Sequence, residues 1–133
     1  MSSKEEMKKL GDAELEIMMA LWEMPEPVTS GKILECIRGK RNWALSTLMA
    51  SLQRLADKGF VHCDRTTRTN YYTPLIDAET YKTFESRSFL GKLYGNSVSS
   101  LVAGLYNSKS ITDEDIDELR ALLDTLDRGE GND

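Results

Sequence analysis

The chain has 133 residues, of which 40% are hydrophobic and 29% charged, and its formal net charge is −5 at pH 7. This length suits one domain, or a small domain with an appendage, and the hydrophobic content excludes disorder as the default. No apolar run approaches the roughly 18 residues that span a bilayer, and the polar N-terminus predicts no secretory signal. We therefore expect a cytoplasmic protein without membrane insertion.

The charges are unevenly distributed along the chain. Residues 38–75 contain seven basic and two acidic residues, whereas residues 76–133 contain six basic and twelve acidic residues. A basic centre followed by an acidic C-terminal part is typical of a chain in which one segment meets a polyanion. Chance clustering of charge in a short window is the alternative.

Three helices are predicted in the first half of the chain. The first has an N-cap at Asp12 and extends through about Glu23, where two prolines restrict the backbone. The second is capped by Thr29 or Ser30. The third covers residues 44–58, with leucines at helical spacing on one face and a glycine directly after its end.

A β-hairpin is predicted over residues 60–74, directly after the third helix. Its polar turn contains Arg65 and Arg68, and both flanking segments have strand propensity. Because strand residues alternate, one of Tyr71 and Tyr72 packs in the core, and the other can donate a hydrogen bond to a phosphate. The order helix, helix, helix, hairpin indicates a winged helix-turn-helix.

The fold class is mainly α with a small β-hairpin, divided into a winged-helix DNA-binding domain (residues 1–75) and a three-helix dimerisation domain (residues 76–133). In the last helix, Thr112 is the expected N-cap and Asp115 completes a capping box. The apolar stripes of this region are too wide for so short a segment to bury alone, and a second copy covers them better than folding back on the first domain. The predicted dimer contacts are Tyr81, Phe84, Val98, Leu101, Val102, Leu105, Ile116, Leu119, Leu122, Leu123 and Leu126.

One face of the third helix is built from small polar and methyl side chains. Four residues at i, i+3, i+4 and i+7 lack the Lys and Glu that a solvated helix face usually carries. Small side chains allow a helix to approach base edges in the major groove, and an arginine can bind guanine or a phosphate. A solvated face is the alternative. The predicted DNA contacts are Arg41, Trp43, Ser46, Thr47, Ala50, Ser51, Arg54, Arg65, Arg68 and Tyr71.

Neither catalysis nor a metal or cofactor site is predicted. His62 is the sole histidine, and no partnered nucleophile or phosphate-binding loop is visible. Cys36 and Cys63 form no recognised zinc motif with this histidine and suggest a reducing compartment, with a disulfide between them as the alternative. A winged-helix protein-interaction module without DNA binding is the main competing function.

Five stretches carry a family resemblance that extends from about Leu10 to Leu126. They are DAELEIMMALWE, VTSGKILECI, NWALSTLMASLQRLADKGFV, YYTPLI and LRALL. Together they resemble the penicillinase-repressor (BlaI/MecI/CopY) family of bacterial transcriptional repressors. The resemblance implies a winged-helix domain, a helical dimerisation domain, and a homodimer that blocks transcription on a dyad-symmetric operator.

The resemblance also implies routes of induction. In the β-lactam branch, a membrane sensor protease triggers cleavage at an Asn-Phe pair, and Gly104-Leu105 stand at those positions here. In the copper branch, Cys-x-Cys pairs near the C-terminus bind metal, whereas the last cysteine of this chain is Cys63. The chain therefore departs from the residues on which both routes depend.

A further difference from the family lies at the N-cap of the third helix. Relatives often carry Ser there, where this chain has Ala44.

Overall fold

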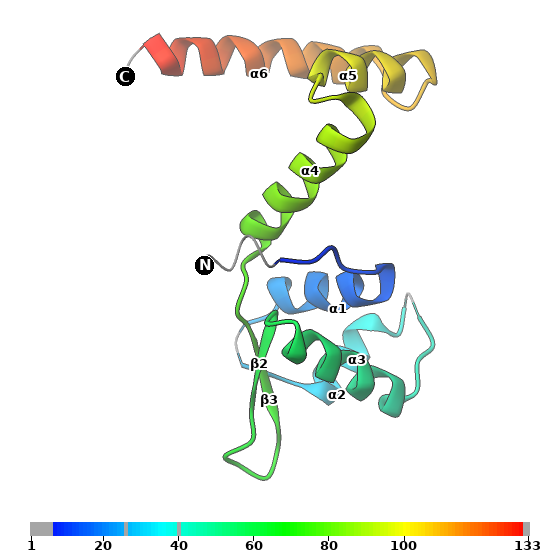
Figure 1. Cartoon of the computed structure of the whole chain (residues 1–133), viewed down its shortest axis with the longest axis vertical. Coiled ribbons are helices and arrows are strands. Elements are labelled where there is room, and N and C mark those ends of the chain that lie inside the picture. Colours follow the sequence, from blue (N-terminus) through cyan, green and yellow to red (C-terminus); the bar gives the residue numbers. More distant parts are fainter. Residues whose placement is uncertain (1–6, 26, 40, 132–133) are drawn as a thin grey trace. The chain divides into compact units, whose positions relative to one another are not determined.

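The computed structural model of the protein describes residues 7–25, 27–39 and 41–131. It shows a mainly helical fold with one small antiparallel sheet, which confirms the fold class predicted from the sequence (Figure 1). The chain forms two compact units, Met1–Ser86 and Arg87–Asp133. None of the described helices combines the length and the apolar composition that a membrane-spanning segment needs.

The first unit has the order of elements that the sequence predicts. Its elements are α1 (Asp12–Glu23), β1 (Val28–Thr29), α2 (Ser30–Ile37), α3 (Leu45–Asp57), β2 (Val61–Asp64), β3 (Tyr71–Pro74) and the beginning of α4 (Ala78–Tyr94). Figure 1 shows α1, α2 and α3 packed together, with the β2–β3 hairpin as a wing beside them. The unit is therefore a winged helix-turn-helix.

The sheet contains one strand more than the predicted hairpin. β1 pairs antiparallel with β3, so the strand order is β1-β3-β2. Val28 lies opposite Tyr72 in this pairing, and Cys63 lies opposite the same tyrosine from the other side. A strand of two residues has no sequence periodicity, and its pairing depends on a partner far along the chain.

The helix ends follow local side-chain chemistry, with one difference from the prediction. The N-cap of α1 is Gly11 rather than Asp12, and its N–H donates to the carboxylate of Glu14 at 3.2 Å. Thr29 caps α2 as expected, because its Oγ1 accepts from the N–H of Lys32 at 3.2 Å. An acid at the third helical position can satisfy the first backbone donors when no capping hydroxyl precedes it.

The N-terminus of α3 has no side-chain cap, whereas that of α6 (Asp113–Gly131) has one. α3 begins after Ala44, which offers no side-chain cap, and it is followed by Gly59 at φ +84°, a left-handed conformation that glycine adopts without steric cost. Thr112 and Asp115 bond reciprocally at 3.1 and 2.8 Å, which confirms the capping box of α6.

The core of the first unit is apolar and lies between the three helices and the sheet. Tyr72 is 3% exposed and Tyr71 is half-buried, so the alternation predicted for the wing is confirmed. The buried hydrophobic residues are Leu10, Ile17, Met18, Ala20, Leu21, Val28, Ile33, Leu34, Ile37, Leu48, Leu52, Leu55, Phe60, Val61, Tyr72 and Tyr81. Such a core positions α3 relative to the wing.

Tyr81 belongs to this core, which corrects its assignment to a dimer contact. Its side chain is 1% exposed, and its hydroxyl oxygen accepts from the N–H of Leu10 at 2.8 Å. Its ring packs edge-on against Phe60 with centroids 5.7 Å apart. Phe84 packs against the same core, and the first unit extends to Ser86.

The second unit contains the end of α4, α5 (Val98–Asn107) and α6. None of its side chains that the structure describes is buried. The predicted dimer contacts Leu122, Leu123 and Leu126 are 51%, 55% and 52% exposed, respectively. Soluble domains rarely leave this much apolar surface without a partner, so the assignment of these residues to a dimer contact stays a prediction.

Candidate nucleic-acid interface

The position of α3 is set by the leucines on one of its faces. Leu48, Leu52 and Leu55 are at most 1% exposed and pack against the other helices of the first unit. Ser46, Thr47 and Ala50 are exposed on the remaining surface of the helix. The exposed surface is therefore small and polar at the beginning and centre of α3, as the sequence predicts.

Ser51 is a correction to the predicted DNA contacts. Its side chain is 1% exposed, and its Oγ accepts a hydrogen bond from Nη2 of Arg54 at 2.9 Å. The residue lies three positions after Leu48 and four before Leu55, and these spacings put it on the buried stripe of the helix. Hence its expected place on the exposed face is wrong.

Arg54 and Lys58 share a carboxylate from another helix. Nζ of Lys58 lies 2.8 and 2.9 Å from the two carboxylate oxygens of Glu14, and Nε of Arg54 lies 3.8 Å from one of them. Burial raises the pKa of Glu14, but the bonds from Lys58 and the Gly11 N–H, and the two positive charges, lower it below its usual value. The carboxylate is thus ionised at neutral pH and neutralises part of the charge on α3.

Arg41 and Trp43 lie in the connection before α3. Nε of Arg41 forms an ion pair with Oε2 of Glu16 on α1, and its guanidinium lies 5.7 Å from the ring centroid of Trp43. Trp43 packs partly against the core of the unit. Both predicted contact residues therefore border the N-terminal end of α3, but the arginine already has an anionic partner. Sequence reasoning missed Glu14 and Glu16 as partners of these cations, because both glutamates lie on α1, far from α3 in the sequence.

The wing presents its arginines on an exposed turn. Asp64 accepts from the Thr66 hydroxyl at 2.7 Å and from the Thr66 N–H at 2.9 Å, and these bonds lower the pKa of its carboxyl group. Arg65 donates from Nη2 to Oε1 of Gln53 on α3 at 3.2 Å. Arg68 is exposed. The wing turn is thus organised by its own hydrogen bonds, and the Arg65 side chain connects it to α3 at the surface.

A second contact connects the wing to α3 beneath the surface. The Tyr72 hydroxyl lies 3.9 Å from the sulfur of Met49. Burial is the main cause of the raised pKa of Tyr72, and the neighbouring Cys63 adds to it. This phenol therefore stays protonated at neutral pH, and Tyr71 is the less buried of the two tyrosines of β3.

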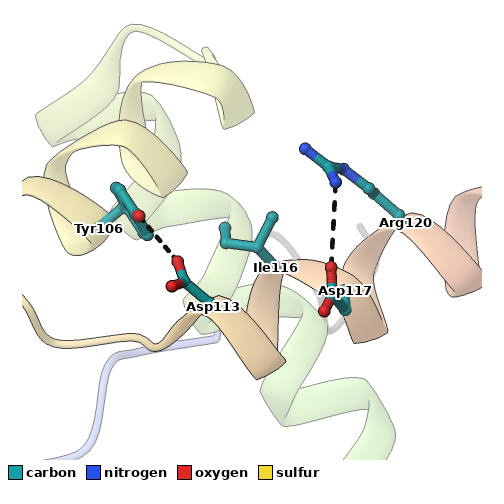
Figure 2. A pocket seen from close by; sticks show the side chains of 5 residues that line it. All are labelled: Tyr106, Asp113, Ile116, Asp117 and Arg120. Atoms are coloured by element: carbon teal, nitrogen blue, oxygen red, sulfur yellow. Dashed lines mark hydrogen bonds and ion pairs between the residues drawn. The ribbon is translucent and has the colours of Figure 1, made fainter.

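A hollow of about 420 Å³ lies on the second unit, between α5 and α6 (Figure 2). Tyr106 donates to Asp113 at 2.8 Å, and Arg120 lies 3.9 Å from Asp117. Ile116 lies between these two pairs. The polar groups lining the hollow are exposed and mutually paired, and the described residues contain no group of three or more potential metal ligands. The hollow thus lacks the features of a catalytic or metal site.

Comparison with known proteins identifies the family. The sequence model of the penicillinase repressor family matches residues 10–125. The chain belongs to the penicillinase repressor family. It is 30% identical over 121 residues to the penicillinase repressor of Bacillus licheniformis, a match that covers 89% of this chain and 94% of that protein. The transcriptional regulator BlaI of Mycobacterium tuberculosis is 30% identical over 126 residues, covering 95% and 91% of the two chains.

A solved structure supports the fold of this penicillinase repressor family member. The solution structure of the DNA-binding domain of the repressor BlaI has a TM-score of 0.50 and 28% identity, and the match covers 56% of this chain and 90% of that one. The family consists of DNA-binding transcriptional repressors rather than enzymes. The predicted family, winged-helix fold and role in transcriptional repression are therefore confirmed.

Proposed function

We propose that the protein represses transcription as a homodimer that binds a dyad-symmetric operator through α3 and the wing, residues 60–74. The observation that carries this proposal is the exposed row of Ser46, Thr47 and Ala50 on a helix whose opposite face is fixed in the core. A helix that enters the major groove needs small side chains where it meets the base edges.

The exposed residues have different expected roles on DNA. The Thr47 hydroxyl and methyl groups, and the Ala50 methyl group, can meet base edges such as a thymine methyl. Ser46 lies in the first turn of α3, where backbone N–H groups favour a phosphate. The exposed wing residues Arg65 and Arg68 can bind the phosphate backbone or the minor groove.

The homodimer is supported by the surface of the second unit. The described apolar residues of this unit are half-buried or exposed rather than buried, and a two-fold contact is the commonest way to cover such a surface. Two copies would place two α3 helices in successive turns of the major groove. We propose that the protein acts on DNA in the cytoplasm, without catalysis or a cofactor.

The experiment is a fluorescence-anisotropy titration of the full chain with two duplexes. One contains the dyad-symmetric element upstream of its own gene, and the other has the same bases scrambled. We expect tight, salt-sensitive binding to the first duplex and weaker binding to the second. Replacing both wing arginines, R65Q/R68Q, should weaken binding to both duplexes and reduce the slope of log K against log salt by about 0.9 for each lost phosphate contact.

The matched control removes two positive charges elsewhere. Arg87 and Lys92 are exposed residues of α4 in the second unit, and R87Q/K92Q makes the same charge change. If both double variants lose the same DNA affinity, the wing arginines act only through the net charge of the protein. Absence of binding to either duplex at low salt would overturn the proposal and favour a protein-interaction module.

A further inference from the structure

Glu16 forms an ion pair with an arginine that the proposed function places at the DNA. Its Oε2 pairs with Nε of Arg41, directly upstream of α3, and the two side chains are 28% and 35% exposed. The ring of Trp43 covers one side of the guanidinium. The pair is therefore accessible to solvent and ions while the arginine is already held near the N-terminal end of α3.

The neighbouring acid on the same helix differs from Glu16 in its burial. The Glu14 side chain is 9% exposed and pairs with Lys58, which makes it a structural part of the unit. Glu16 lies two residues further along α1 and is three times as exposed. A partly exposed ion pair contributes little to stability, so the loss of this pair costs little when Arg41 binds another anion.

A carboxylate and a DNA phosphate are alternative partners for one guanidinium. Sequence-independent binding depends almost entirely on cations that neutralise phosphates, each adding about 0.9 to the salt slope on B-DNA. An arginine whose charge is neutralised by a glutamate adds little to this attraction. In a specific complex, by contrast, many fixed contacts hold α3 against the backbone, and the phosphate can displace the carboxylate.

We propose that Glu16 is a specificity-determining residue: by competing with phosphate for Arg41, it lowers the affinity of the protein for DNA of arbitrary sequence. This inference rests on the proposed DNA-binding function of α3. On a non-cognate duplex Arg41 stays with Glu16, whereas on the operator it transfers to a phosphate. The preference for the operator over other DNA is thereby increased without a base contact.

The test compares Glu16→Gln with the native protein on the operator and scrambled duplexes. The variant should bind the scrambled duplex about fivefold more tightly at low salt, with a slope steeper by about 0.9. The salt slope on the operator should not change, because Arg41 is on a phosphate there in both proteins. Introducing E16Q into an R41Q background should have no effect on either duplex, since the two residues act through each other.

The control is Glu23→Gln, which makes the same charge change at an exposed position of the same helix. An increase with E23Q equal to that of E16Q would show a general charge effect and overturn the inference. So would unchanged or weaker binding of E16Q to the scrambled duplex, or a full E16Q effect in the R41Q background. If the native protein binds neither duplex, the proposed function itself fails, and that result is distinct from these.

Discussion

The ammonium group of Lys58 lies 2.8 and 2.9 Å from the two carboxylate oxygens of Glu14. This contact joins the C-terminal end of α3 to the first turn of α1, across 44 positions of sequence. Both charges also suit the helix ends at which they lie, because an acid is favourable near an N-terminus and a cation near a C-terminus. The orientation of the proposed reading helix thus depends on a residue that does not touch DNA.

Removing this contact should destabilise the first unit. We expect Glu14→Gln to lower the free energy of unfolding by about 1–2 kcal/mol. The neutral amide accepts a weaker hydrogen bond from the partly exposed Lys58 than the carboxylate does. Urea unfolding measures the loss. In an E14Q/K58M variant, part of the loss should be recovered, since no unpaired ammonium is left behind. A single variant as stable as the native protein would contradict the assignment.

The same residue should make stability sensitive to acid. The pKa of Glu14 is lower in the folded protein than its ordinary value of 4.5, so its contribution is present above about pH 4.5 and is lost as pH falls through the folded pKa. Between neutral pH and about pH 3, the native protein should therefore lose more stability than E14Q. Thermal unfolding across this range tests the difference, and parallel curves for the two proteins would refute it.

Tyr81 should make the stability of the protein sensitive to alkali. Burial, with the bond that its hydroxyl donates to Glu85, raises the pKa of Tyr81 to about 12 despite the N–H of Leu10. Its contribution is fully present below the unfolded pKa of about 10 and is lost as pH rises through the folded pKa. Tyr81→Phe should be less stable at neutral pH by about 1 kcal/mol, and this gap should narrow above pH 10. A constant gap in urea unfolding would exclude the mechanism.

Thr47 and Ser51 should separate DNA reading from packing. Thr47 is exposed, so Thr47→Ala should reduce the preference for the operator over scrambled DNA by about 1 kcal/mol and leave unfolding unchanged. Ser51 is buried and bonds to Arg54, so Ser51→Ala should instead change stability more than sequence preference. Anisotropy and urea unfolding of both variants provide the comparison. A larger loss of preference in S51A would reverse the assignment.

The exposed leucines of α6 should control assembly. The double substitution Leu122→Glu/Leu126→Glu places two charges on the apolar stripe and should convert a dimer into monomers. Sedimentation velocity measures this change. Operator affinity should fall with it, because two half-sites are then bound independently. The control A121E/T125E adds the same charges at the same spacing on a neighbouring, exposed face of the helix. If the native protein is a monomer, or if both variants behave alike, the proposed contact surface is wrong.

Several features could be predicted from sequence because they depend on nearby residues. The leucine spacing of α3, the capping box of Thr112 and Asp115, and the alternation of Tyr71 and Tyr72 are local patterns with local causes. Each involves side chains within one helix, at a helix end or on one strand. The family resemblance extended these patterns to a function, and the family match confirmed it.

The tertiary structure alone decided which polar residues are free to act. Tyr81 is polar enough for a surface yet lies in the core, because the segment before α1 supplies a hydrogen-bond partner for its hydroxyl. Ser51 is also buried, and its hydroxyl accepts from Arg54 of the same helix. The charge of residues 38–75, counted along the sequence, omits Glu14 and Glu16, although both glutamates pair with cations of that segment. A sequence determines how many charges a segment has, but packing determines the distances between them, and electrostatic attraction depends on those distances.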